Sequence, residues 1–304
     1  MAQQSQSKRM TRIEVLVIVF MCVLFIGVLP LTCRKSRSFE HQMTCGMNLS
    51  SIGRAIQIYA DDYEGDFPRA GGESSVWSPR ISNWVADDRY VAYDLNPADG
   101  SGGAASITSS FYLLVKYSDV LPKTFLCPGD KGTTEFKPAD YGERIKKLAD
   151  LWDFGPYKPR EHCSFSYHMT YSQYPLTTSS ESGMAIAADP NPWISSSFVD
   201  GKGAGLFAQF NPDERDKAKI GNAITHREEG QNVLFMNGHV EFDKYSFWAV
   251  NDDNIYTFWD GGDIRRGGFP IPGTSEPQDK LDSFLVNDGN IAIGPKPTLE
   301  EVNR

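Results

Sequence analysis

The stretch MTRIEVLVIVF, residues 10–20, starts an almost unbroken apolar run that carries one carboxylate, that of Glu14, near its beginning. The run from Ile13 to Cys33 spans 21 residues. As a helix it would extend about 31 Å, the hydrocarbon thickness of a bilayer. We therefore expect a retained transmembrane helix over residues 10–33. Two alternatives are a cleaved secretory signal, although no convincing cleavage site follows the run, and a lipoprotein attached through Cys33.

The charge of the chain is unevenly distributed. Residues 1–37 carry six basic side chains against the single acid Glu14, a local balance of +5, which leaves −14 for the rest of a chain whose net charge is −9. An acidic body argues against nucleic-acid binding, because that needs a cationic surface to neutralise phosphates. We expect the short leader, residues 1–9, in the cytoplasm and the large acidic body outside it.

A second helical pattern follows the apolar run, over residues 34–66. The sequence EGDFP, residues 64–68, should end this helix because Gly65 and Pro68 break helices. Apolar side chains recur within it at three- and four-residue spacing, which places them in one stripe along the helix: Leu49, Ile52, Ile56, Tyr59 and Tyr63. The stripe needs a cover, and the rest of the chain must provide it.

A globular head is expected over residues 67–270 and a loop-rich tail over 271–304. The clearest local pattern is NVLFMNGHVEF, residues 232–242, in which Asn237-Gly238 separates two apolar runs and favours a type I′ hairpin turn. We predict an α+β fold in which a long N-terminal helix, a membrane anchor continuing into the ectodomain, packs against an antiparallel β-sheet head with long loops.

Motifs along most of the chain resemble the type IV pilin-like, pseudopilin family of the planctomycete type. This family has a prepilin-type amino terminus and a carboxy-terminal motif of a His, a spacer and Asp-Gly, where this chain has Asn237-Gly238. Besides the opening stretch, the motifs follow in the family's order: CGMNLSSIGRAIQIYADDYEGDFP (45–68), LLVKYSDVLPKTFLCPGD (113–130), CSFSYHMTY (163–171), AADPNPW (187–193), HREEGQNVLFMNGHVEF (226–242) and DNIYTFWD (253–260).

The resemblance implies processing at the amino terminus. In this family a specialised peptidase cuts before the apolar run and methylates the new amine, which here places the cut between Arg9 and Met10. Glu14 would then pair with the terminal amine of a neighbouring subunit, since an unpaired carboxylate in hydrocarbon is costly. Arg9 stands where the family has Gly, and Arg12 where it has Leu, so cleavage is left open. The alternative for Glu14 is a place among lipid headgroups beside Arg12.

Five cysteines are present, at positions 22, 33, 45, 127 and 163. Cys127 and Cys163 lie beside predicted strands and match family motifs, which makes them the preferred disulfide pair. A bridge through Cys45 and free thiols are the alternatives. Cys22 is expected to be a packing residue of the apolar run. The absence of a CxxC pattern argues against a redox enzyme or a zinc ribbon.

The family hairpin motif supplies the other candidate site. His226 and His239 could face each other near Glu228 and Glu241, but we expect them to fix the hairpin by hydrogen bonds rather than to hold a metal. No nucleophile accompanies them, so we predict no catalytic residue and no enzymatic activity. The motif comprises His226, Gly230, Asn232, Asn237, Gly238 and His239.

Two acidic loops, NDDN and DGGD, offer closely spaced oxygens of the kind that calcium prefers. Calcium is the only cofactor that the sequence suggests, and solvated turns are the alternative. The carboxylates concerned are Asp252, Asp253, Asp260 and Asp263.

The resemblance implies a structural subunit of a type II secretion or type IV pilus-like assembly, held in the bacterial cytoplasmic (inner) membrane by a single pass with an extracytoplasmic head. Its expected partners are the membrane and other pilin-like subunits or secretion-system proteins, and no nucleic acid. The alternative is a solitary anchored binding protein whose head recognises a ligand such as a glycan. Exposed aromatic residues would then form the binding platform: Trp77, Trp84, Trp193 and Trp259.

Overall fold

The computed structural model describes residues 11–142, 147–194 and 201–289, with the side chains of residues 24–36 left out. The predicted leader, residues 1–9, and the predicted processing pair Arg9 and Met10 lie outside the described residues, as does the end of the predicted tail from residue 290. The chain divides into two compact units, Met1–His41 and Gln42–Arg304.

Helix α1, Arg12–Asp62, begins with a reciprocal cap. The carboxylate of Glu14 accepts a hydrogen bond from the backbone N–H of Thr11 at 2.6 Å, and the Thr11 hydroxyl accepts one from the N–H of Glu14 at 3.3 Å. This arrangement is a capping box, which satisfies backbone donors that have no partner inside the helix. Glu14 therefore has a local structural role that the sequence interpretation did not include.

The apolar part of α1 in the first unit is exposed from Ile13 to Val23. Among the side chains that the structure describes, no helix is both long and apolar enough to cross a membrane. This finding contradicts the predicted transmembrane anchor over residues 10–33 and the single-pass membrane location. The described apolar side chains, Ile13 to Val23, extend over about 16 Å of helix, whereas a bilayer needs about 30 Å. The rest of the predicted span, residues 24–33, lies outside the described side chains.

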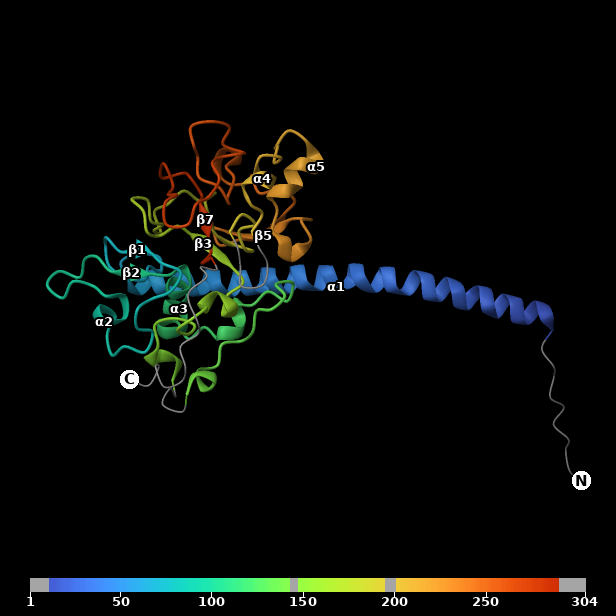
Figure 1. Cartoon of the computed structure of the whole chain (residues 1–304), viewed down its shortest axis with the longest axis horizontal. Helices are drawn as coiled ribbons and strands as arrows, with labels where there is room; N and C mark the ends of the chain where they lie inside the picture. Colours follow the sequence, from blue (N-terminus) through green and yellow to red (C-terminus); the bar gives the residue numbers. More distant parts are fainter. Residues whose placement is uncertain (1–10, 143–146, 195–200, 290–304) are drawn as a thin grey trace, which may run out of the picture. The chain divides into compact units, whose positions relative to one another are not determined.

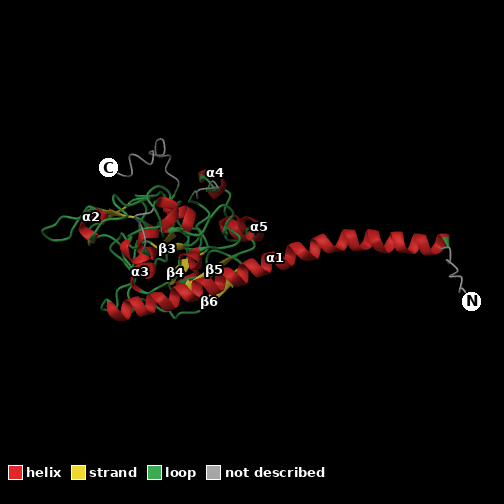
Figure 2. Cartoon of the chain, turned by 90° about the horizontal axis from the view of Figure 1, so that it is seen from below, coloured by secondary structure: helices red, strands yellow, loops and turns green. Residues whose placement is uncertain are grey.

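In the second unit, residues 42–62 of α1 bury one stripe of side chains against the head, on the side of β5 and β6 (Figure 2). A Cβ atom on Gly53 would lie 2.8 Å from Cδ1 of Leu234, so the helix backbone approaches β5 closely. Tyr63 is 39% exposed and belongs to a surface cleft instead of the stripe. The other four predicted residues of the stripe are at most 7% exposed, as expected: Leu49, Ile52, Ile56 and Tyr59.

The end of α1 agrees with the prediction made from EGDFP. The last helical residue is Asp62, and the backbone N–H of Gly65 donates to the carbonyl of Ala60 at 2.9 Å. Gly65 has a φ of +92°, a conformation that glycine adopts without steric cost. This turn directs the chain away from the helix and into the head.

The head is built on a five-stranded antiparallel sheet of order β6-β5-β4-β3-β7, so the structure is α+β. Strand β7 pairs with β3, with Tyr167 opposite Val286, and Figure 1 shows it as the last element of the described chain. It lies inside the segment that we expected to be a loop-rich tail. The strands are β3 Ser166–His168, β4 Ala185–Ala188, β5 Gln231–Phe235, β6 Val240–Asp243 and β7 Leu285–Val286.

Both faces of the sheet are covered. Leu234 of β5 belongs to the large apolar cluster that includes α1, whereas its neighbours Val233 and Phe235 belong to a second cluster with Trp193 and Tyr256. Alternate residues of a strand point to opposite faces, which explains this division. All five residues of β5 are therefore buried.

The hairpin of β5 and β6 is present, but the predicted type I′ turn is wrong. The N–H of Gly238 donates to the carbonyl of Phe235 at 2.8 Å, and the N–H of Phe235 donates to the carbonyl of His239 at 3.0 Å. Only Gly238 has a positive φ, +82°, while a type I′ turn needs positive φ at both central residues.

The remaining elements surround this sheet. Helix α3, Ile107–Tyr117, belongs with α1 to the large apolar cluster, and β1 (Val76–Trp77) pairs in parallel with β2 (Ala104–Ala105). Two short 3-10 turns matter for the site below: η1 (Pro122–Phe125) and η6 (Ile224–His226). The other α-helices are short: α2 Arg89–Tyr93, α4 Ala204–Phe207 and α5 Arg215–Ala218.

Two buried carboxylates fix the start of α3. Asp288 accepts hydrogen bonds from the N–H groups of Ile107 at 3.0 Å and Thr108 at 2.8 Å, while Asp153 accepts one from the hydroxyl of Ser106 at 2.6 Å. Burial raises the pKa of Asp153 to about 8 and also raises the pKa of Asp288. Asp288 lies two residues after β7, so the carboxy-terminal strand and the start of α3 are held together.

Candidate functional site

A disulfide joins Cys45 of α1 to Cys127, which follows η1, with their Cα atoms 5.1 Å apart. The preferred pairing of Cys127 with Cys163 is therefore wrong, and the alternative through Cys45 is correct. Cys163 is a buried free thiol directed at the carbonyl of Phe165, and burial raises its pKa to about 12. The sequence could not show which cysteine pairs with Cys127, because Cys45 comes close to it only when α1 packs on the head.

Two further side chains lie against this disulfide. Nε2 of His226 is 3.0 Å from Oδ2 of Asp189 and 3.7 Å from Sγ of Cys127. Both His226 and Asp189 are almost completely buried, at 1% and 0% exposed side chain. Burial lowers the pKa of His226, but the carboxylate of Asp189 outweighs burial, so the pKa is raised above its usual value.

Asp189 is held in place by β5. Its Oδ2 atom accepts hydrogen bonds from the backbone N–H of Asn232 at 2.7 Å and from the side-chain amide of Asn232 at 3.0 Å. Its other oxygen, Oδ1, is buried and has no hydrogen-bond partner. A buried carboxylate oxygen without a partner is unusual, since such an atom costs free energy comparable to a lost hydrogen bond.

Four segments thus bring four potential ligands together: Cys45, Cys127, Asp189 and His226. One ligand atom from each lies within 4.8 Å of all the others, and all four residues are buried. We call this set the buried ligand cluster. Among the described residues it is the only group of three or more His, Cys, Asp or Glu side chains whose ligand atoms converge in this way.

Glycines allow the segments of the cluster to approach one another. A Cβ atom on Gly129 would lie 2.5 Å from the carbonyl oxygen of Thr225, so only glycine lets the loop after Cys127 pack against η6. A Cβ atom on Gly46 would lie 3.0 Å from Oδ1 of Asn232, which limits the side chain that can follow Cys45 on α1. The glycines that follow Cys45 and Cys127 therefore let both segments approach their neighbours closely.

Of the other members of the hairpin motif, Asn232 contacts the cluster through Asp189, whereas Gly230 and His239 lie outside it. His239 is half exposed, and its imidazole stacks on Phe235. Gly230 has a φ of +152°, and a Cβ atom there would lie 2.2 Å from the carbonyl oxygen of Asp243, so this position needs glycine. His226 and His239 thus do not form a shared site. The expected hydrogen-bonding role is met for His226, whose partners are Asn232 of the hairpin and Asp189, which follows β4.

The predicted calcium ligands do not converge. Asp253 is buried and accepts a hydrogen bond from the N–H of Ser283 at 2.6 Å, whereas Asp252 is exposed. Asp260 accepts one from the N–H of Gly262, and Asp263 forms an ion pair with Arg265 at 2.8 Å. These contacts are those of ordinary turns, and the described residues offer no calcium site there.

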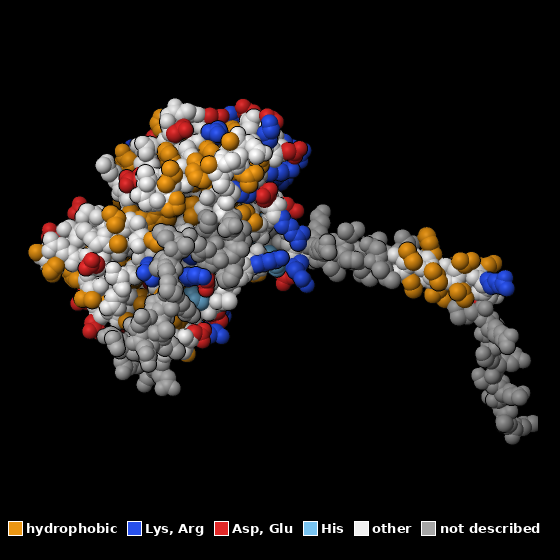
Figure 3. Space-filling model, in the orientation of Figure 1, with side chains coloured by type: hydrophobic (Ala, Val, Ile, Leu, Met, Phe, Trp, Pro, Cys, Tyr) orange, Lys and Arg blue, Asp and Glu red, His pale blue; other side chains and the backbone are white. Residues whose placement is uncertain are grey.

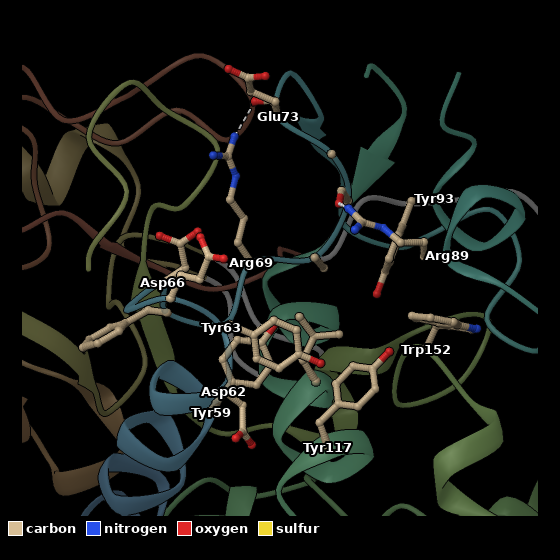
Figure 4. A pocket seen from close by; sticks show the side chains of 16 residues that line it. Tyr59, Asp62, Tyr63, Asp66, Arg69, Glu73, Arg89, Tyr93, Tyr117 and Trp152 are labelled. Atoms are coloured by element: carbon tan, nitrogen blue, oxygen red, sulfur yellow. Dashed lines mark hydrogen bonds between the residues drawn. The ribbon is translucent and has the colours of Figure 1, made fainter. Parts of the chain in front are cut away.

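A surface cleft of about 560 Å³ lies between the end of α1, α2 and α3 (Figure 4). Tyr59 and Tyr63 stack in it with their ring centroids 4.1 Å apart and their planes 9° from parallel. Tyr117 stands beside them, with its ring centroid 5.9 Å from that of Tyr63, and Trp152 lines the opposite wall. Tyr63 and Tyr117 are 39% and 45% exposed, so their rings are open to a ligand.

Two arginines enter the same cleft. Arg89 donates to the carbonyl of Gly71 at 2.6 Å, and Arg69 donates to the carbonyl of Glu73. Of the tryptophans that the sequence suggested as a platform, Trp84 and Trp193 are buried. Trp77 and Trp259 do not line the cleft. The aromatic surface comes instead from tyrosines that the sequence assigned to the helix stripe or did not single out.

Comparison with protein-family models, with curated proteins and with solved structures gives no match to this chain. The resemblance to pilin-like proteins therefore depends on the sequence motifs alone.

Proposed function

We propose that the chain is a structural subunit of a pilin-like assembly and that copies of it pack against one another through the first part of α1. The observation that carries this proposal is the exposed apolar side chains at the start of α1 (Figure 3). Nine large apolar side chains there are between 46% and 74% exposed: Ile13, Val15, Leu16, Val17, Ile18, Val19, Phe20, Met21 and Val23.

These residues are nearly consecutive, so they occupy every face of the helix. A helix that is apolar on all faces is stable when other apolar groups surround it. A single partner helix would cover one side only. The pattern therefore favours an assembly in which each copy has more than one neighbour, as a filament does.

The charges at the start of the helix favour a second copy as the neighbour. Arg12 and Glu14 lie within one turn, so a staggered second copy would place a cation of one chain beside the carboxylate of the other. Glu14 keeps its cap on Thr11 through one oxygen, Oε2, and its second oxygen is available to such a partner. The resemblance implies the same pairing of Glu14 with a neighbouring chain.

Cys22 provides a direct test, because its side chain is exposed within this stretch. In cells that produce the full chain with Cys33→Ser, a short bismaleimide should cross-link two copies through Cys22. Cys22→Ser should abolish the product, and Glu14→Lys should weaken it at least several-fold. The matched control carries Cys22→Ser together with Ser179→Cys, which places the cysteine at an exposed position of the head. No cross-linked product is expected from it. Absence of the Cys22 product would contradict the proposal.

A second candidate function is ligand binding by the head, which the aromatic cleft favours. Stacked, exposed tyrosine rings beside arginine side chains suit a saccharide, whose apolar ring face packs on aromatic rings while its hydroxyls accept hydrogen bonds. Screening the purified protein against a glycan array should then give binding that Tyr63→Ala and Tyr117→Ala each lower at least tenfold. Trp248→Ala, a change of an exposed aromatic residue outside the cleft, should leave it unchanged.

A further inference from the structure

We propose that the buried ligand cluster binds a zinc ion when Cys45 and Cys127 are reduced, so that a disulfide and a metal ion are alternative cross-links at the same position. This inference is independent of the proposed assembly. It concerns only residues of the second unit, and it would hold for a head that acts alone.

The donor set consists of ligand types that bind zinc. Two thiolates, one imidazole nitrogen and one carboxylate oxygen make a four-coordinate set, and all four groups are buried, as in closed structural sites. Calcium and magnesium prefer oxygen donors alone, which this cluster does not offer. Thiolate together with imidazole favours zinc among the common divalent ions.

The ligand atoms are spaced close to the distances of tetrahedral coordination. Zinc bonds of about 2.0 to 2.3 Å place neighbouring ligand atoms about 3.3 to 3.8 Å apart. The separation of Sγ of Cys127 from Nε2 of His226 is already 3.7 Å, and that of Nε2 from Oδ2 of Asp189 is 3.0 Å. The two sulfur atoms must separate once the bond between them is broken, and the other ligand atoms, all within 4.8 Å of one another, need only small shifts.

Asp189 gives independent support. Its Oδ1 atom is buried without a hydrogen-bond partner, although the side chain is 0% exposed. Asn232 meanwhile holds Oδ2 with two hydrogen bonds, an arrangement that orients a carboxylate ligand in many metal sites. A metal ion would satisfy the charge of this carboxylate in a place where no described protein donor reaches Oδ1.

Reduction of the Cys45–Cys127 disulfide requires a reductant, and a dithiol can supply the electrons and protons. Thiol–disulfide exchange breaks the sulfur–sulfur bond, and the dithiol is oxidised to its own disulfide as two electrons and two protons pass to Cys45 and Cys127. Zinc then replaces the two thiol protons, and any proton on Nε2 of His226, all of which pass to solvent. Asp189 binds as the carboxylate.

Either cross-link would serve the same structural purpose. Cys45 belongs to α1, Cys127 follows η1, Asp189 follows β4 and His226 ends η6. The disulfide ties α1 to one loop of the head, whereas a zinc ion would tie α1 to that loop, the sheet and η6 together. The head would therefore keep α1 in place under both oxidising and reducing conditions.

The test uses the full chain with Cys22→Ser and Cys33→Ser, so that no cysteine outside the second unit binds metal. The protein is reduced with dithiothreitol, freed of metal with a chelator, transferred to buffer without either reagent, and titrated with Co²⁺, whose spectrum reports its ligands. We expect one Co²⁺ per chain, with thiolate-to-cobalt charge-transfer absorption and the intense visible bands of tetrahedral geometry. Zinc should displace these bands, and the oxidised protein should show none.

Variants separate the cluster from other thiols and histidines. Cys45→Ser, Asp189→Asn and His226→Gln should each weaken Co²⁺ binding at least tenfold, whereas Cys163→Ser and His239→Gln should leave it unchanged. Far-UV circular dichroism and melting with and without zinc check folding, and zinc should raise the melting temperature of the reduced protein but not that of His226→Gln. Reduced protein that neither binds Co²⁺ stoichiometrically nor gains stability or structure from zinc would overturn the proposal. Unaltered binding by Cys45→Ser would do the same.

Discussion

Gly53 of α1 lies directly against Leu234 of β5, and a Cβ atom on the glycine would be 2.8 Å from Cδ1 of that leucine. Helix and sheet meet here with no space for a side chain. We expect Gly53→Val to lower the free energy of unfolding by about 1 to 3 kcal/mol, because a well-packed core does not accept added volume. Urea denaturation of the purified protein would measure the change.

A second glycine serves as the control for Gly53. Gly205, in α4, has no heavy atom within 4 Å of the position that a Cβ would take. Gly205→Ala should leave stability unchanged or raise it by a few tenths of a kcal/mol, since alanine favours helix more than glycine does. Equal effects of the two substitutions would show that α1 does not pack on β5 through Gly53.

The buried ion pair of Asp130 and Arg160 gives another test. Nη1 of Arg160 is 3.3 Å from Oδ2 of Asp130, and both side chains are at most 4% exposed. Asp130→Ala would leave the guanidinium buried without a counter-charge, and we expect a loss of about 3 to 5 kcal/mol in denaturant unfolding.

The matched surface pair is Lys217 and Glu214, 2.8 Å apart and about half exposed. Glu214→Gln should leave the free energy of unfolding almost unchanged, because solvent screens an exposed pair. A loss at Asp130 as small as this would mean that water reaches Arg160.

Stability should depend on pH through Asp153. Its folded pKa is raised to about 8, while an unfolded chain should ionise it near pH 4. Between these values the folded protein holds a proton that the unfolded chain has lost, so this contribution to stability is complete below about pH 4 and disappears as pH rises toward 8. Asp153→Asn should remove this contribution to the pH dependence of stability. The free energy of unfolding of the variant, relative to that of the wild-type protein, should therefore rise by about 1 kcal/mol per pH unit in the middle of the window.

Denaturation at a series of pH values would measure this slope. Asp150 is exposed and lies three residues before Asp153, so Asp150→Asn provides the control and should run parallel to the wild-type protein. If the stability of Asp153→Asn also changes with pH in parallel with that of the wild-type protein, Asp153 is already ionised in the folded protein.

The disulfide should stabilise the oxidised head. Cys45 and Cys127 are 82 residues apart, and closing a loop of that length stabilises a protein by about 4 kcal/mol in the chain-entropy account. Under oxidising conditions without metal, the double substitution Cys45→Ala and Cys127→Ala should lower the free energy of unfolding by several kcal/mol. Cys22→Ser, at an exposed position, should change it little, and a similar result for both proteins would contradict a structural role for the bond.

Local patterns in the sequence predicted local structure well. The spacing of Leu49, Ile52 and Ile56 identified the face of α1 that is buried, and Asn237-Gly238 marked the hairpin. The turn type was wrong, because Asn237 does not adopt a positive φ in the folded hairpin. Strand β7 was missed altogether, since two residues, Leu285–Val286, are too few to show a period.

The candidate site depended on contacts that no local pattern contains. Cys127, Asp189 and His226 all lie in motifs that the sequence singled out, yet His226 was matched with His239 and Cys127 with Cys163. The missing information was the position of α1, which brings Cys45 to the same place. Four motifs that each include a potential ligand, Cys45 among them, are the only clue that the sequence offered to the cluster.

The position of β7 has a consequence for how the protein is made. Strand β3 is complete at His168, but its outer neighbour β7 and the carboxylate of Asp288 are synthesised more than a hundred residues later. A nascent chain on the ribosome would expose the edge of β3 and leave the N–H groups of Ile107 and Thr108 without Asp288 until residue 288 has emerged. The sheet and the start of α3 are therefore completed only after Leu285 and Asp288 have emerged, and a product that stops short of Leu285 should be recognised by chaperones and proteases.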